Sequence, residues 1–145
     1  MKIRIVLFSL ILAAATLAGA DEVHFAVTGI TSIETGRLTA FCTGHMGPIG
    51  ETTPPPVPCE VSLLFHNLRG TVVKEETMVL QPGTGGFLDL RGSEVSKAGR
   101  VEIDPCYKVT LGAIVGGIQL IDNLTGLTTV LASPAALAVG GLGPS

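Results

Sequence analysis

The chain has 145 residues and a formal net charge of −3, and this length suits one domain after removal of a leader. The mild acidity argues against nucleic acid or an anionic lipid surface as the partner, because both require a basic face. The sequence contains no Trp and one Tyr, so a carbohydrate-binding face built from stacked aromatic rings is not expected.

The first twenty residues predict export. Lys2 and Arg4 form a charged start, an uncharged apolar run covers 5–17, and Ala18-Gly19-Ala20 supplies small residues at the end. These are the three parts of a secretory signal peptide over 1–20, with cleavage after Ala20. The apolar run is shorter than the ~20 residues of a spanning helix. We therefore expect a periplasmic or extracellular protein with no membrane insertion after cleavage.

Period-two alternation predicts β-strands after the leader. One strand covers 23–28, the next ends at Cys42, and a third runs from Cys59 to Asn67. His24 and His66 fall on the outward phase of their strands, where a histidine is ordinarily solvated. The residues predicted to face inward are Leu38, Ala40, Cys42, Cys59, Val61, Leu63 and Phe65, and the later strands are expected to add Leu88, Leu90, Val109 and Leu111 to the same core.

Turn signals separate the later strands. Asn67-Leu68-Arg69-Gly70 leads into 71–80, which makes 71–80 the hairpin partner of the preceding strand. A strand through Pro105 indicates an edge or a bulge, and Asn123-Leu124-Thr125-Gly126 connects a last hairpin. About eight short strands with turns between them predict an all-β fold, a single antiparallel Ig-like β-sandwich over residues 21–132.

Two segments fall outside this pattern. The stretch Gly44–Pro58 contains five of the nine prolines, and a loop of this length is usually functional or mobile. The tail over 133–145 is rich in Ala, Gly, Leu and Pro and carries no charge. We expect that tail to be poorly ordered.

Three cysteines follow the leader, and an oxidising compartment predicts one disulfide and one leftover thiol. Cys42 and Cys59 share the inward phase of what we expect to be adjacent antiparallel strands, so phase favours a bridge between them. Cys106 lies in the opposite phase to Tyr107, among charged residues. A Cys42–Cys106 bridge, or three reduced thiols, stay as alternatives.

A metal site is the alternative for the same region. Cys42, His45 and Met46 bring a thiol, an imidazole and a thioether together at the start of the proline-rich loop, and Cys59 is a fourth possible ligand. These groups suit Cu(I). The bridge and the copper site exclude each other, because copper requires Cys42 as a thiolate. We favour the structural interpretation, in which Cys42 is a disulfide cysteine.

Four different motifs of strand and turn residues are distributed along the mature region. They are Pro58-Cys59-x-Val61-x-Leu63-x-Phe65, Leu80-x-Pro82-Gly83, Leu88-Asp89-Leu90 and Asp122-Asn123-x-Thr125-Gly126-x-Thr128-Thr129-Val130-Leu131. This series, over about Leu38 to Leu131, resembles a group of small uncharacterised exported bacterial proteins that look like Ig-like β-sandwiches. The resemblance implies that fold and export, implies no activity, and implies a Cys59–Cys106 bridge.

The sequence offers no catalytic arrangement. No serine lies in a G-x-S-x-G setting, and the carboxylates are scattered. We therefore predict a non-catalytic exported binding or structural module that contacts protein, with no cofactor and no nucleic acid. The alternative is a periplasmic copper-binding protein that uses Cys42, His45 and Met46.

Overall fold

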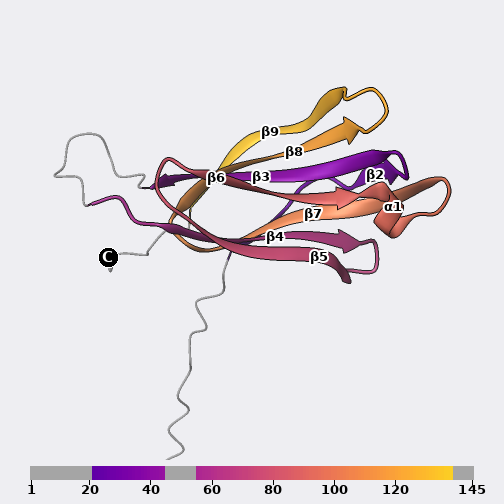
Figure 1. The fold of residues 1–145 in the computed structure, drawn as a ribbon. Helices are drawn as coiled ribbons and strands as arrows, with labels where there is room; N and C mark the ends of the chain where they lie inside the picture. The colour runs from indigo at the N-terminus through magenta and orange to yellow at the C-terminus, as the bar shows by residue number, and fades with distance from the viewer. Residues whose placement is uncertain (1–20, 45–54, 139–145) are drawn as a thin grey trace, which may run out of the picture.

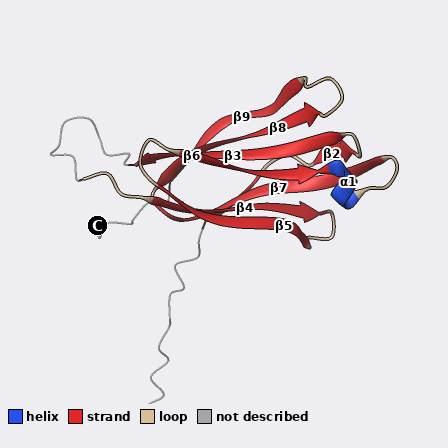
Figure 2. Ribbon diagram, in the orientation of Figure 1, coloured by secondary structure: helices blue, strands red, loops and turns tan. Residues whose placement is uncertain are grey.

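The computed structural model describes residues 21–44 and 55–138 and contains two antiparallel sheets (Figures 1 and 2). One sheet has the order β1-β7-β4-β5, with β2 also paired to β7, and the other has the order β6-β3-β8-β9. The all-β sandwich predicted from the sequence is confirmed. The elements are β1 (Asp21–His24), β2 (Thr28–Thr31), β3 (Glu34–Gly44), β4 (Cys59–Asn67), β5 (Val72–Leu80), β6 (Gly85–Arg91), α1 (Gly92–Val95), β7 (Arg100–Leu111), β8 (Ala113–Asp122) and β9 (Thr128–Ala138).

The core lies between the two sheets. Ten of the eleven residues predicted to face inward are buried, and burying each large aliphatic side chain stabilises the fold by about 1.5–3 kcal/mol. The prediction was wrong for Leu111, which is 48% exposed, because a bulge between Val109 and Leu111 sets Leu111 opposite Glu60 of β4. The two predicted hairpins also form, as β4–β5 and β8–β9. Other large buried side chains are Ile30, Ile103, Tyr107, Ile114 and Ile118.

Tyr107 joins the two sheets through its side chain. Its hydroxyl oxygen lies 2.6 Å from the carbonyl oxygen of Thr39 and 2.8 Å from that of Gly117, and both acceptors belong to the opposite sheet. Gly116 makes room for the ring, because a Cβ there would lie 2.6 Å from a ring carbon of Tyr107. The only tyrosine of the chain is therefore a polar anchor inside an aliphatic core.

Alkaline titration is expected to report on this anchor. Burial raises the pKa of Tyr107 well above its ordinary value of 10.0. The unfolded chain releases the proton more easily than the folded chain, so stability is lost as the pH rises above about 10. Since the chain has one tyrosine, tyrosinate absorbance should rise together with unfolding followed by circular dichroism. Ionisation near pH 10.0 in a protein that is still folded would contradict the buried placement.

Pro105 explains why the strand predicted over 23–28 is divided into β1 and β2. The Phe25 N–H donates to the Pro105 carbonyl at 2.9 Å. In an antiparallel ladder the N–H and C=O of one residue point to the same side. The nitrogen of Pro105, which carries no hydrogen, therefore faces the segment between β1 and β2 and gives that segment no donor. The proline sits inside β7, and the interruption appears in the neighbouring edge strand.

The C-terminal boundary differs from the predicted one. β9 continues beyond residue 132, and Ala138 pairs with Ala113 of β8. Residues 133–138 therefore belong to the sheet, and their small uncharged side chains are compatible with strand pairing. The remaining part of the predicted tail and the predicted leader lie outside the described residues. Among the residues that the structure describes, no helix is long and apolar enough to cross a membrane.

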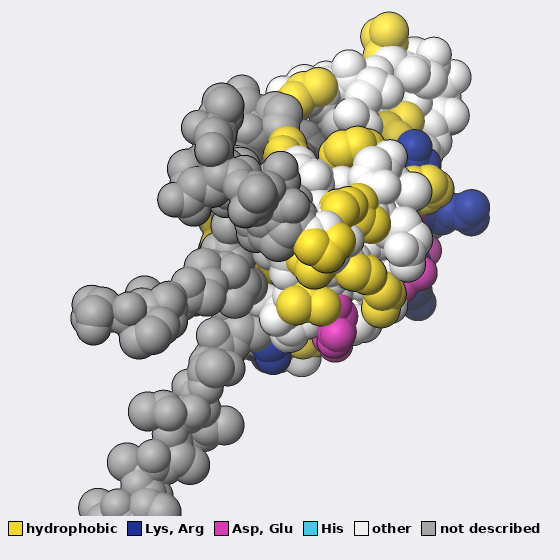
Figure 3. Space-filling view, turned by 90° about the vertical axis from the view of Figure 1, so that its left-hand side faces the viewer, with side chains coloured by type: hydrophobic (Ala, Val, Ile, Leu, Met, Phe, Trp, Pro, Cys, Tyr) yellow, Lys and Arg dark blue, Asp and Glu magenta, His cyan; other side chains and the backbone are white. Residues whose placement is uncertain are grey.

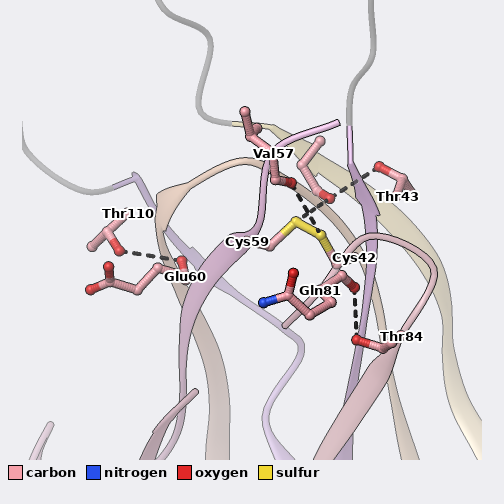
Figure 4. Close-up of a disulfide and its surroundings, with 9 residues drawn as sticks. Cys42, Thr43, Val57, Cys59, Glu60, Gln81, Thr84 and Thr110 are labelled. Atoms are coloured by element: carbon pink, nitrogen blue, oxygen red, sulfur yellow. Dashed lines mark hydrogen bonds between the residues drawn. A yellow bond between two sulfur atoms is a disulfide. The ribbon is translucent and has the colours of Figure 1, made fainter. Parts of the chain in front are cut away.

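The disulfide joins Cys42 to Cys59, as strand phase predicted, with 5.7 Å between the Cα atoms. Figure 4 shows the bridge beside Val57 and the turn that contains Gln81 and Thr84. Cys106 is a free, buried thiol. The Cys59–Cys106 bridge that the resemblance implied is not formed. The expectation that the two bridged strands are adjacent was wrong: β3 and β4 belong to different sheets, so the bridge ties the sheets together.

Candidate metal centre

Four potential metal ligands meet on the outward side of the five-stranded sheet. They are Glu22 and His24 of β1, His66 of β4 and Cys106 of β7. One ligand atom from each residue lies within 4.8 Å of the ligand atoms of the other three. The cluster therefore joins three neighbouring strands that are far apart in the sequence.

Strand register explains why these side chains meet. His24 pairs with Cys106, and His66 pairs with Asp104. Residues two apart on one strand share a face, so Glu22 lies beside His24 and Asp104 lies beside Cys106. Paired residues on adjacent strands have their Cβ atoms about 4.5–5.5 Å apart. Alternation and pairing together place all five side chains on one side of the sheet.

Hydrogen bonds hold two of the ligands in position. The Cys106 thiol donates to Oε1 of Glu22 at 3.2 Å, and Nε2 of His24 lies 3.5 Å from the same oxygen. Nδ1 of His24 lies 2.9 Å from Oδ2 of Asp104. A carboxylate at one ring nitrogen fixes the tautomer and directs the other nitrogen toward a metal. Asp104 is therefore placed to orient His24 with Nε2 toward Glu22 and Cys106.

His66 is the least expected member of the cluster. The residue is only 7% exposed, and its buried Nδ1 has no hydrogen-bond partner within 21–44 and 55–138. Oδ1 of Asp104 is also buried without a partner. Each unpaired buried polar atom costs about 1–3 kcal/mol. A cation near these atoms would offset that cost.

The surroundings of Cys106 are apolar and acidic. Burial raises the pKa of the Cys106 thiol, and the hydrogen bond to Glu22 and the negative charge of Glu22 raise it further. Without a cation the group is therefore a thiol. A metal ion supplies the positive charge that stabilises a thiolate, and its binding releases the proton.

No family model, curated protein or solved structure matches the chain. The resemblance to exported Ig-like proteins therefore stays a prediction. The assignment of a function depends on the geometry of the side chains.

The sequence-predicted site residues have different outcomes in the structure. Cys42 is in a disulfide and provides no thiolate for copper, while His45 and Met46 lie outside the described residues. His24 is half exposed, as predicted. The prediction that His66 is solvated was wrong, because its strand is covered on both faces near this residue: the outward-facing Leu64 is also buried. Cys106 does lie on the outward phase but is completely buried.

The donor set suits a small transition-metal ion. It contains one sulfur, two imidazole nitrogens and one carboxylate, which are the ligands that Zn²⁺ takes in tetrahedral sites. Bonds of 2.0–2.3 Å place tetrahedral ligand atoms roughly 3.3–3.8 Å apart. The Cys106–Glu22 and His24–Glu22 separations of 3.2 Å and 3.5 Å are already close to this range. Rotation of the side chains would draw the remaining pairs together.

Proposed function

We propose that this protein is a non-catalytic exported module that binds a divalent transition-metal ion, Zn²⁺ in the first instance. The ligands are Glu22, His24, His66 and Cys106. The observation that carries the proposal is that a thiol, two imidazoles and a carboxylate offer ligand atoms within 4.8 Å of one another. Among the described residues, the buried Nδ1 of His66 has no hydrogen-bond partner. A thiolate and a carboxylate together neutralise a divalent cation, and neutral imidazoles complete the set.

The number of ligands supports a binding role over a catalytic one. Structural zinc sites have four protein ligands, whereas catalytic sites have three and leave a position for water or substrate. Two surface pockets lie on the outward side of the other sheet, lined mainly by β3, β6 and β8. These pockets are separate from the cluster, so they offer no substrate cavity beside it.

The cysteines support export. A disulfide that persists indicates an oxidising compartment, which agrees with the predicted leader over 1–20. Cys106 is buried and stays a thiol in the absence of a cation, so it can remain reduced in that compartment and available as a ligand. The disulfide and the proposed centre thus give every cysteine of the chain a defined role.

Zinc is expected to stabilise the protein. At a free Zn²⁺ concentration about a hundred times the Kd, binding to the folded state alone adds about 2.7 kcal/mol to the free energy of unfolding. The measurement is chemical denaturation with Zn²⁺ and with a chelator, in wild type and in the variants Cys106→Ser and His66→Gln. Both variants should lose most of the zinc-dependent increase. Titration with Co²⁺ should give a thiolate charge-transfer band that Cys106→Ser removes.

His45→Ala is the matched control. It removes the one histidine that does not belong to the cluster, and it tests the copper alternative. This variant should respond to Zn²⁺ as wild type does. Circular dichroism without metal verifies that each variant is folded. Failure of Zn²⁺ to change the unfolding of wild type would refute the proposal for zinc. A loss of metal binding in His45→Ala with none in Cys106→Ser would assign the ligands to the proline-rich loop.

A further inference from the structure

In the part of the chain that the structure describes, the strand β9 forms an open edge of the four-stranded sheet. It pairs with β8 on one side and ends the order β6-β3-β8-β9, as the outermost arrow in Figure 1 shows. It is eleven residues long. An edge of this kind presents a row of backbone N–H and C=O groups, and an extended strand satisfies such a row.

The other sheet edges carry charged side chains, and β9 does not. β5 contains Lys74, Glu75 and Glu76, and β6 contains Asp89 and Arg91. On the remaining edge, β1 contains two acids and a histidine, and the four-residue β2 that follows it is uncharged. By contrast, no residue from Thr128 to Ala138 is charged. Charges on edge strands oppose pairing with another chain, and a strand as short as β2 offers little backbone to pair with. β9 is therefore the long edge strand that lacks this protection.

An exposed apolar surface continues from β9 across the outward side of its sheet. Val130 is 63% exposed and lines a shallow pocket of about 300 Å³ together with Phe41 and Val115. Phe87, on the opposite edge strand, is also exposed. Figure 3 shows hydrophobic side chains grouped on the described surface at one end of the sandwich. A strand added to β9 would lie directly beside this apolar surface.

We propose that a second copy of this chain pairs with β9 in antiparallel orientation. The two four-stranded sheets then form one continuous sheet about a two-fold axis. Such an interface uses the same segment from both subunits, so every charge on an edge strand would enter the interface twice. The uncharged β9 brings no charge into such an interface. Pro134 lies between Ala132 and Ala135, where the pairing with β8 is irregular, so pairing between copies centres on Thr128–Leu131.

Sedimentation equilibrium over a range of protein concentrations tests the proposal, with a chelator present so that the metal centre plays no part. Wild type should form dimers, and Val130→Lys should weaken dimerisation at least tenfold. Phe87→Lys is the matched control, because it places the same charge on the same face at the opposite edge of the same sheet. This variant should dimerise as wild type does. Amide exchange of β9 should be slower in the dimer than in Val130→Lys.

Three results would overturn the proposal. The first is a wild-type monomer at every concentration. The second is a dimer that Val130→Lys leaves intact. The third is a dimer that Phe87→Lys dissociates as strongly as Val130→Lys does, because the contact would then involve the apolar face and not the edge. Circular dichroism of both variants separates loss of pairing from loss of folding.

Discussion

Replacing Tyr107 with alanine is expected to lower the free energy of unfolding by about 3–5 kcal/mol, the usual cost of deleting a large buried ring. The ring is fully buried and meets Phe25 edge-on, with 5.0 Å between the ring centroids. Alanine would leave a cavity between the sheets and would remove the hydroxyl from the carbonyls of Thr39 and Gly117. Denaturation followed by far-UV circular dichroism measures the loss.

Two further variants separate the contributions. Tyr107→Phe keeps the ring and removes only the hydroxyl, so we expect a smaller loss of about 0.5–1.5 kcal/mol, the usual net contribution of a hydrogen bond. The Gly117 carbonyl keeps the Thr39 hydroxyl as a donor at 3.2 Å. Leu124→Ala changes a turn residue that is 77% exposed and should leave stability nearly unchanged. If Tyr107→Ala were no more destabilising than Leu124→Ala, the ring would not be a core residue.

Removing the disulfide is the second large effect. Changing Cys42 and Cys59 together to alanine is expected to cost about 3 kcal/mol, because the bridge restricts the unfolded chain. The two cysteines are separated by 17 positions, a loop of the size for which this value holds. They also connect β3 of one sheet to β4 of the other. The measurement is the midpoint of chemical unfolding with and without a reductant.

Cys106→Ala is the matched control, because it removes a buried cysteine and keeps the bridge. The reductant should destabilise wild type and Cys106→Ala alike, and should leave the double variant unchanged. Equal stability of the double variant and wild type would contradict a stabilising bridge. Sensitivity of the double variant to the reductant would point to a different sulfur pairing.

Much of the fold follows from local patterns in the sequence. Period-two alternation identifies the strands and assigns Leu63 and Phe65 to the core, because successive side chains of a strand point to opposite faces. Short turns such as 67–70 also identify which strands pair, since a tight turn forces its two strands together. The long segment between Cys42 and Cys59 carries no such constraint. Local patterns therefore did not reveal that β3 and β4 lie in different sheets.

The candidate metal centre depends on contacts that no local pattern contains. Glu22 and His24 reach Cys106 only because β1 pairs with β7, and His66 joins them because β4 lies on the other side of β7. Alternation tells which face a side chain occupies and leaves open what lies beside it. One local signal was present. Leu64 is an apolar residue on the outward face of its strand, the same face as His66, and an apolar residue there indicates that this face is partly covered.

The position of the disulfide also affects how the chain responds to cleavage. Cys42 and Cys59 flank residues 45–54, so a protease that cuts one peptide bond in that interval releases no fragment. The two pieces stay joined through sulfur and separate on a denaturing gel only after reduction. Continuity of the molecule across this interval does not depend on its backbone. A single cut in this interval therefore leaves the two sheets joined covalently through the bridge.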